Sequence, residues 1–511
     1  MSDLRAQGTL KADPDLAEKY YGNKNYKAAL NVYLLLLKKE PKNPDFNFKA
    51  ARCYLNSHSI KAKAIPLLEF VVAQDKFDYD AWFDLARAYH FGNQFDKAIH
   101  AYNKYKEKNS KKAEEIDRLI QQCVNGKELV KRPLDVTFEN LGKLVNSPDP
   151  DYYPYVTPDD QTLVFTTRRK SSAGPEVDGF YPSDIYIITK KAEVWSKAAS
   201  IGGNINTALD EQATDLSADG TNVLFYIDHI EIMGDIHQSK RLNSKAAFLK
   251  SQPLNDKINS GFETAASIWT SPEGDSQILI FSSSRPDNFG QTDLYMCRQV
   301  PKSNAEGEVI YEWGLPQNLG ANVNTKFKEE FGHLSTDGKT LYFASEGHSS
   351  IGGFDIFKSV WEEEEQQWSK PRNLGFPVNS AEDEMNISFI TGDRIGYMSA
   401  MREEGLGDLD IYKVTFNEVE GKETIFRGHV IGDSTVKLRD AIIHVENKKT
   451  NEPYGTYNPE RSKGYYVMAL PPGKWHVTIE ADGYKIYEED IVLFDFAGFK
   501  PEVVKNFYLK K

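Results

Sequence analysis

One phrase of sequence occurs five times between residues 151 and 415, and it limits what this chain can fold into. Each copy opens with an acidic residue, continues through an apolar stretch ending in Thr or Ser, turns on a run such as PDD, ADG or TDG, and resumes with a second apolar stretch. The clearest copy is EEFGHLSTDGKTLYFAS, residues 329–345. Gly and Asp supply the positive φ angle and the local hydrogen bonds of a tight hairpin. The phrase therefore predicts one strand–turn–strand hairpin per copy.

The residues after each hairpin complete a larger unit. A Gly-rich loop leads to a third strand that begins with Asp followed by Ile or Leu, and a fourth segment often carries Trp and then Asn-Leu-Gly, as in WSKPRNLG. Four strands in a repeat of about 50–60 residues are typical of a propeller blade. We therefore predict a five-bladed β-propeller over residues 134–417. The segment VTFENLGKLVNS (136–147) has no hairpin before it, so we expect it to be the outermost strand of the last blade and to close the ring.

Residues 13–130 have a helical period instead. In AWFDLARAYHFGNQFDKAIHAYNKY, Trp82, Leu85 and Tyr89 share one predicted helix, and Ala98 and Tyr102 share the next. This order of large and small residues matches the tetratricopeptide (TPR) pattern, a helix–turn–helix unit of roughly 34 residues. Two weaker copies precede it. We predict a TPR helical solenoid with Trp82, Leu85 and Tyr89 in its core, after an N-terminal tail over residues 1–12.

A third pattern occupies residues 424–511. TIFRGHVIGD, AIIHVENKK and GYYVMALPPGKWHVTIEADGY read as strands separated by turns such as Asp482-Gly483. This pattern predicts a small β-sandwich of about seven strands. The predicted fold class is therefore multidomain, α then β: a helical solenoid, a five-bladed propeller and a sandwich.

Composition excludes several classes of protein. The formal net charge of −13 over 511 residues argues against nucleic-acid binding. No run of 18 or more apolar residues is present, so the sequence predicts no transmembrane segment. The first ten residues lack the apolar core of a signal peptide, which leaves a cytoplasmic protein or an exported one whose signal was removed. Cys53, Cys123 and Cys297 are too sparse for a disulfide framework or a zinc site.

The sequence contains no catalytic or cofactor motif, so we predict no enzyme, no catalytic residues, no cofactor and no metal site. The strongest candidate for binding is the acid that opens each repeated phrase. Because the innermost strand of a blade lines the central channel, five carboxylates are predicted to surround one channel mouth. A ring of this kind could hold a cation or a Lys/Arg-rich partner segment. The interpretation that we prefer is that each acid caps its own turn, since repeat proteins reuse structural residues in every unit. The candidate residues are Asp151, Glu211, Glu263 (expected one residue out of step), Glu329 and Glu382.

The order of these modules resembles a Bacteroidota family of periplasmic proteins. Its members combine TPRs, a WD40-like propeller of the PD40 type and a carboxypeptidase-regulatory-like sandwich, as in the PorE-like family associated with type IX secretion. The resemblance depends on YVTPDDQTLVF, LSADGTNVLFY and LSTDGKTLYFAS, and on the ending FRGHV with GYYVMALPPGKWHVTIEADGY. Family members usually continue into an OmpA-like domain that binds peptidoglycan. This chain ends at Lys511 in a predicted sandwich strand, so the resemblance assigns peptidoglycan binding to no residue here.

The resemblance implies a non-enzymatic periplasmic scaffold associated with the outer membrane. Its expected partners are proteins of an outer-membrane secretion (type IX) or gliding apparatus, which it would help anchor to the cell envelope. The alternative is a ligand-binding module whose propeller mouth takes a cationic peptide or a sugar. A hydrolase is the third hypothesis, because propellers host enzymes and a fold does not decide function.

Overall fold

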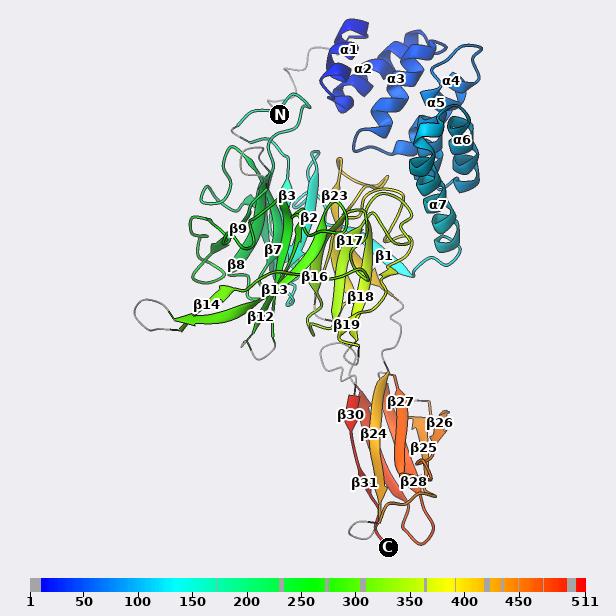
Figure 1. Ribbon diagram of the computed structural model, residues 1–511, viewed down its shortest axis with the longest axis vertical. Coiled ribbons are helices and arrows are strands. Elements are labelled where there is room, and N and C mark those ends of the chain that lie inside the picture. Colours follow the sequence, from blue (N-terminus) through cyan, green and yellow to red (C-terminus); the bar gives the residue numbers. More distant parts are fainter. Residues whose placement is uncertain are drawn as a thin grey trace. The chain divides into compact units, whose positions relative to one another are not determined.

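A computed structural model describes most of the chain as two compact units, residues 1–390 with 395–415, and residues 391–394 with 416–511 (Figure 1). Most of the predicted N-terminal tail, residues 1–10, lies outside the described residues. The described residues are 11–171, 173–228, 234–271, 274, 276–303, 309–362, 365–390, 392–417, 423–432, 436–448, 450–471, 473–493 and 502–511.

The first unit begins with helices that pack as successive antiparallel pairs, α1 with α2, α3 with α4 and α5 with α6, followed by α7 against α6 (Figure 1). Asp13 and Asn43 cap α1 and α3 through side-chain oxygens, and a proline follows each cap, where its missing N–H costs no helical bond. The elements are α1 (Pro14–Gly22), α2 (Tyr26–Lys39), α3 (Pro44–Leu55), η1 (Lys61–Ala64), α4 (Ile65–Val72), α5 (Asp80–Phe91), α6 (Phe95–Lys108), η2 (Ser110–Lys112) and α7 (Ala113–Leu129).

The helical core agrees with the sequence in part. Leu85 and Tyr89 of α5 are buried, as predicted, and Tyr102 of α6 packs in the same cluster. Trp82 is only partly buried against that cluster, because the face of α5 that carries it is not fully covered. Alanines such as Ala51 and Ala98, which are fully buried, allow the helices to approach closely.

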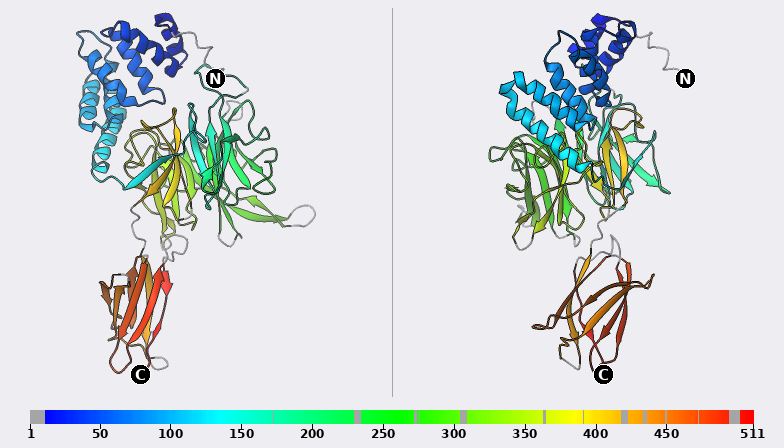
Figure 2. Two further views of the ribbon diagram at one scale, coloured as in Figure 1. Left: turned by 180° about the vertical axis from the view of Figure 1, so that it is seen from behind. Right: turned by 90° about the vertical axis from the view of Figure 1, so that its right-hand side faces the viewer.

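The described residues of the β-rich part of the first unit form five antiparallel sheets, which we number 1 to 5 along the chain (Figure 2). Sheet 1 contains β2 (Asp151–Val156), β3 (Thr162–Thr167), β4 (Asp184–Lys191), β5 (Val194–Trp195) and β6 (Ala199–Ser200). Sheet 2 contains β7 (Asp210–Leu216), β8 (Asn222–Asp228), β9 (Ile236–Lys240) and β10 (Gln252–Pro253). Sheet 3 contains β11 (Glu263–Thr270), β12 (Gln277–Ser283), β13 (Asp293–Ser303), β14 (Val309–Trp313) and β15 (Gln317–Asn318). Sheet 4 contains β16 (Glu329–Leu334), β17 (Thr340–Ser345), β18 (Asp355–Glu362), β19 (Gln367–Trp368) and β20 (Arg372–Asn373). Sheet 5 contains β21 (Ile387–Phe389), β22 (Ile395–Ala400), β23 (Asp410–Phe416) and β1 (Val136–Asn140).

These sheets form the ring of a β-propeller. The first strand of each sheet is innermost: β2 packs on β7, β7 on β11 and β11 on β16, while β21 packs on β2. Sheets 4 and 5 meet through the rings of Tyr342 and Phe389, whose centroids are 4.8 Å apart. The second strands fill the space between sheets with fully buried aromatic rings, among them Phe165, Phe225 and Phe281.

The ring closes where the sequence predicts. β1 lies beside β23 as the outermost strand of sheet 5, although β1 precedes sheet 1 in the chain. The N–H of Leu141 donates to the carbonyl of Ile411 at 3.2 Å, and the rings of Phe138 and Tyr412 are 6.4 Å apart. Two distant segments therefore share one sheet, which removes an exposed sheet edge.

The second unit is a β-sandwich. One sheet has the order β27-β24-β30 with β31 also on β24, and the other has the order β26-β25-β28-β29. Alternate residues of β24 and β28 face a common core that includes Phe426 and Trp475. Its strands are β24 (Thr424–Ile431), β25 (Ile442–Asn447), β26 (Pro453–Tyr457), β27 (Tyr465–Leu470), β28 (Gly473–Glu480), β29 (Tyr487–Leu493), β30 (Glu502–Val504) and β31 (Phe507–Tyr508).

Candidate protein-binding surfaces

Four of the five acidic residues that open the repeated phrases are buried rather than open to solvent. Each of these four stands at or next to the start of an innermost strand, after a turn that begins with Asn and then Ser or Thr. Glu329 shows the pattern: it accepts hydrogen bonds from the N–H of Thr325 (2.8 Å), the Thr325 hydroxyl (2.7 Å) and the Ser345 hydroxyl (2.6 Å). The residues with no exposed surface are Asp151, Glu211, Glu263 and Glu329.

The same bonds recur in the neighbouring sheets. Asp151 accepts from the N–H of Ser147 at 2.6 Å and from Arg169 at 2.5 Å. Glu211 accepts from the N–H of Thr207 at 3.0 Å and from the Thr207 hydroxyl. Burial raises the pKa of Glu211 to about 7, against the bonds from Thr207 that lower it. The hydrogen bonds of these carboxylates are thus made within their own turns and strands.

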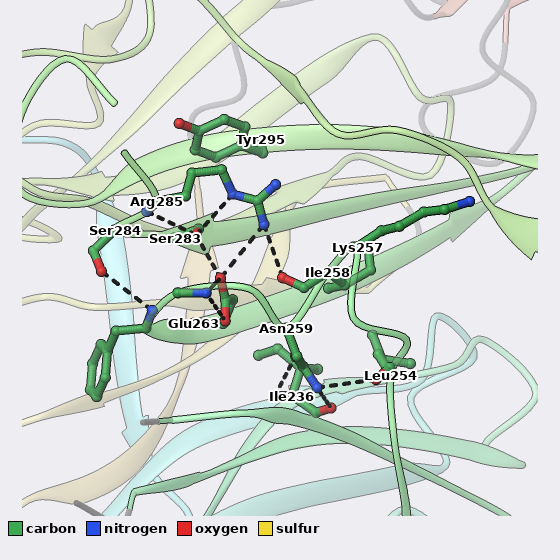
Figure 3. A network of polar contacts seen from close by, with 12 residues as sticks. Ile236, Leu254, Lys257, Ile258, Asn259, Glu263, Ser283, Ser284, Arg285 and Tyr295 are labelled. Atoms are coloured by element: carbon green, nitrogen blue, oxygen red, sulfur yellow. Dashed lines mark hydrogen bonds and ion pairs between the residues drawn. The ribbon is translucent and has the colours of Figure 1, made fainter. Parts of the chain in front are cut away.

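Glu263 differs because its turn is one residue shorter (Figure 3). It accepts from the N–H of Gly261 at 3.1 Å and from the Ser283 hydroxyl at 2.7 Å, and Arg285 lies 3.5 Å away. The Arg285 guanidinium also donates to the carbonyl of Ile258 at 2.9 Å. The Glu263 carboxylate nevertheless accepts from a serine at the end of the second strand, as Glu329 does, so the change of one residue is taken up in the turn.

Glu382 does not occupy the corresponding position in sheet 5. Glu384 does: it accepts from the N–H of Ser380 at 2.8 Å and from the Ser380 hydroxyl at 2.6 Å. The spacing from Ser380 to Glu384 equals that from Ser147 to Asp151, so counting forward from the Asn-Ser pair would have found it. Glu382 is partly buried and instead forms an ion pair with Lys61 of η1. A binding role for the five predicted acids stays a prediction.

The aspartates that open the third strands are held by a second repeated network. Asp293 accepts from the N–H of Phe289 at 2.7 Å and from the amide of Asn318 at 2.7 Å. The side chain of Asn324 bonds both backbone groups of Leu294, at 2.8 and 3.0 Å, as a neighbouring strand would. Asn318 and Asn324 also bond each other at 2.8 Å, so the Asn-Leu-Gly motif serves the structure of the blade.

Aromatic side chains from two sheets meet at the centre of the ring. The rings of Tyr153 in β2 and Phe331 in β16 are 4.5 Å apart, although sheets 1 and 4 are not neighbours in the ring. Both residues have left-handed backbone angles, with φ of 51° and 54°, at irregularities of their strands. An aromatic contact between non-neighbouring inner strands crosses the central channel and narrows it there.

The TPR helices pack against one rim of the propeller (Figure 2). This rim carries the turns that precede the innermost strands. Gln122 of α7 donates to the Ser350 hydroxyl at 3.1 Å and to the carbonyl of Gly352, and Asn125 donates to the carbonyl of Ser350 at 2.8 Å. Residues 346–353 lie in the loop that connects β17 to β18 in sheet 4. Buried polar contacts with good geometry fix the orientation of the helices on this loop.

A buried histidine belongs to the same interface. The ring nitrogen Nε2 of His90 in α5 is 2.7 Å from the carbonyl of Ile351, to which it donates. Only 5% of His90 is exposed, and burial lowers its pKa to about 4. Burial in this interface therefore favours the neutral form of His90.

Charges across this interface are complementary. Lys27 pairs with Asp408 at 3.0 Å, Lys61 pairs with Glu382, and Arg118 lies 3.6 Å from Glu346. The acids come from loops of sheets 4 and 5, and the bases come from the helical region. One further pair, Lys326 with Glu114, has the opposite sense. The acidic rim therefore has a cationic partner within the same chain.

The described residues offer no group of three or more His, Cys, Asp and Glu side chains that could hold a metal ion. Cys53, Cys123 and Cys297 are buried, and burial raises the pKa of each thiol to about 12. A thiol with so high a pKa is a poor nucleophile at neutral pH. Among the described helices, none combines the length and apolar character needed to cross a membrane.

Comparison with known proteins agrees with the helical part of this architecture. A tetratricopeptide repeat family model matches residues 62–123. No curated protein matches the chain. The chain thus combines a TPR-like helical region with a large β-propeller region, and the comparisons give it no narrower family.

Solved structures resemble the chain over about half of its length. TolB from Acinetobacter baumannii is 16% identical, with 53% of this chain and 56% of that chain covered and a TM-score of 0.32. A putative TolB from Agrobacterium tumefaciens is 15% identical, with 56% and 98% covered and a TM-score of 0.29. An endo-arabinase from Bacteroides thetaiotaomicron is 12% identical, with 55% and 98% covered and a TM-score of 0.37. The match spans little more than half of the Acinetobacter protein.

Proposed function

We propose that this chain is a non-enzymatic scaffold that binds other proteins. The observation that carries the proposal is the interface between the helices and the propeller. Gln122 and His90 join the two with buried hydrogen bonds and Asn125 joins them with a partly buried one, and on this proposal these bonds hold both as one body. A rigid body of this kind presents helical and propeller surfaces in a fixed relation, as simultaneous binding of several partners requires.

We further propose an exported, periplasmic location in association with the outer membrane. Support comes from the order of the modules, which resembles that of the Bacteroidota family described above. The partners on this proposal are protein components of an outer-membrane secretion (type IX) or gliding apparatus. Anchoring to the cell envelope proceeds through these protein contacts, since no described residue is assigned to peptidoglycan.

The test is affinity capture of the tagged full chain from its native cells after chemical cross-linking, followed by reciprocal capture with each identified partner. The expected result is one or more membrane-associated proteins that recover the chain in both directions. Failure of every reciprocal capture contradicts the scaffold. Cell fractionation of the same strain tests the location, and recovery of the chain in the cytoplasm contradicts it.

The second candidate is a ligand-binding module whose propeller mouth takes a cationic peptide or a sugar. The ion pair of Glu382 with Lys61 supports the binding of a cationic peptide, because Lys61 shows that a cationic side chain can bind at Glu382. The contact between Tyr153 and Phe331 narrows the channel and favours the scaffold. Calorimetric titration with an oligolysine peptide, at low and at high salt, separates the two: the ligand-binding module predicts salt-sensitive heat, and the scaffold predicts none.

A further inference from the structure

Sheet 3 carries an extension that the corresponding sheets lack. Strand β13 continues beyond its pairing with β12 and pairs with β14 from Gln299 opposite Trp313 to Ser303 opposite Val309. We call these two paired segments, 299–303 and 309–313, the ribbon. Figure 1 shows the ribbon projecting from the propeller. Residues 304–308, which connect its strands, lie outside the described residues.

Sheets 1 and 4 show what the unextended form looks like. There a short hairpin ends on a buried tryptophan: Trp195 pairs with Lys190, and Trp368 pairs with Trp361. Trp313, which pairs with Gln299, takes the same place in sheet 3. The chain between Gln299 and Trp313 therefore takes the place of residues 191–194 of sheet 1, and the fold of a blade does not need the extra length.

The two faces of the ribbon differ in polarity. Cross-strand partners in an antiparallel pair share a face. One face carries Val300 and Ile310 with the Lys302–Glu312 ion pair, whose atoms are 2.7 Å apart. The other face carries Pro301 beside Tyr311 and Ser303 beside Val309, and it has no charge. Tyr311 is 61% exposed and Val309 is 63% exposed, so this uncharged face is uncovered.

The two edges of the ribbon differ as well. The N–H of Gly314 donates to the carbonyl of Arg298 at 2.9 Å, so that pair is hydrogen-bonded. Bonded and non-bonded pairs alternate in antiparallel strands, so the backbone groups of Val309, Tyr311 and Trp313 point outward from β14. On the opposite edge Pro301 has no N–H to offer. In the described part of the chain β14 pairs with β13 alone.

We propose that the ribbon is a docking site for an extended segment of a partner protein, which pairs with the outer edge of β14 as an added β-strand. The outward N–H and C=O groups of Val309 and Tyr311 supply the ladder, and the uncharged face selects apolar or β-branched side chains in the incoming segment. The proline on the other edge directs addition to β14. This inference rests on the proposed scaffold function and assigns one of its binding surfaces.

The test places a photoreactive phenylalanine analogue at position 309 of the full chain in its native cells. Position 194 in the short hairpin of sheet 1, where Val194 is 60% exposed, is the matched control. Position 309 is expected to cross-link to a second protein, and position 194 is not. Equal yields at both positions, or a product that is a dimer of this chain, overturn the proposal.

A pair of substitutions at Tyr311 tests whether the partner pairs with the outer edge of β14. Tyr311→Pro removes the outward N–H of β14, and Tyr311→Thr keeps it in a residue that favours strands. The cross-link from position 309 is expected to fall about tenfold with Tyr311→Pro and to stay within about twofold with Tyr311→Thr. Equal yields from the two variants overturn strand addition.

A third variant separates this inference from the scaffold proposal and does not depend on how Tyr311→Pro folds. Residues 300–312 are replaced by residues 191–194 of sheet 1, which already form a stable hairpin end in this protein. The shortened chain is expected to keep its thermal midpoint and to lose the partner that cross-links at position 309. If it captures the same partners as the parent, the ribbon is not their site and the scaffold stands. If the parent captures no partner, the scaffold itself fails.

Discussion

The buried carboxylate of Glu329 can be tested for its role in the turn. Glu329→Met keeps the length of the side chain and removes every acceptor, which leaves three donors without partners. We expect the free energy of unfolding of the first unit to fall by about 2–4 kcal/mol. Denaturant unfolding measures it, and Glu365→Met, at an exposed acid of the same sheet, is the control.

The same pair of variants tests the predicted binding role. If the carboxylate mainly holds a cationic partner, Glu329→Met weakens partner capture and leaves the unfolding transition where it was. If it caps the turn, stability falls and capture by the folded protein is unchanged. The full burial of the side chain favours the second outcome.

His90 makes a prediction about pH. Its pKa of about 4 in the folded protein lies below the ordinary value of 6.5, so the unfolded chain binds a proton first as the pH falls. The stability that His90 contributes is therefore complete above pH 6.5 and is lost as the pH falls toward 4. Between pH 7 and pH 5 we expect a loss of about 2 kcal/mol from this residue.

His90→Gln is the comparison for that measurement, because a glutamine amide can still donate to the carbonyl of Ile351 but does not titrate. Denaturant midpoints at pH 7 and pH 5 give the loss for each protein. His333, whose pKa burial also lowers to about 4, contributes equally to both. A wild-type loss no larger than that of the variant contradicts the prediction.

The sequence alone did not identify every residue of the turn networks. The acid at the start of each phrase was visible in four copies because an apolar strand and a Gly/Asp turn follow it. In the fifth copy three consecutive acids, Glu382, Asp383 and Glu384, compete for the position. Only the hydrogen bonds to Ser380 decide for Glu384. Arg285, which completes the network of Glu263, takes the place that Arg169 has beside Asp151 in sheet 1, two residues after the second strand. Neither arginine was predicted as part of the repeated phrase.

The strand that closes the ring can be tested as an element. A chain that begins at residue 142 lacks β1, whereas one that begins at residue 131 keeps it, and both lack the helices. We expect the thermal midpoint of the shorter chain to be lower by about 5–10 °C, because sheet 5 loses its outer strand and the contact of Phe138 with Tyr412. Calorimetry measures the shift.

Light scattering gives a second measure of the same change. Without β1 the outer edge of β23 is open to pairing with another chain, so the shorter chain is expected to associate more readily. Matching midpoints and matching scattering for the two chains would show that β1 is dispensable.

Strands and helices that a short sequence motif marks were predictable from the sequence. Elements that no such motif marks were not predictable. The hairpins follow from the alternation of apolar stretches and Gly/Asp turns, and β1 follows from its Asn-Leu-Gly. The inner strand β11 is longer than its counterparts, so its turn bond forms at Ser271 rather than at Thr270. The ribbon of sheet 3 gave no signal in the sequence, since VIYEW reads like any other strand.

Across the chain, the docking of the helices on the propeller is open to direct measurement. Gln122→Ala combined with Asn125→Ala removes the bonds to Ser350 and Gly352. We expect amide hydrogen exchange in loop 346–353 to speed up by about tenfold or more, because the loop loses its cover. Val124→Ala, on the exposed side of the same helix, is expected to leave exchange unchanged.

This docking could not be read from the sequence. The partners Lys61 and Glu382, or Gln122 and Ser350, are more than two hundred residues apart, and each looks like an ordinary surface residue in its own segment. The order of helices before strands was predictable because the spacing of apolar residues that distinguishes them is a local property of the sequence. Which surface of one module meets which loop of another depends on the tertiary structure alone.

The position of β1 sets an order of events during synthesis. The strand leaves the ribosome before sheet 1, yet its partner β23 appears only near residue 416. At roughly 5–20 residues per second this gap lasts from about a quarter of a minute to about a minute. The helices are complete throughout this gap, while the loop that covers His90 and Gln122 is synthesised only in its last part. Ring closure and helix docking are therefore both late steps. A nascent chain held before them keeps both β1 and the docking face of the helices available to a chaperone.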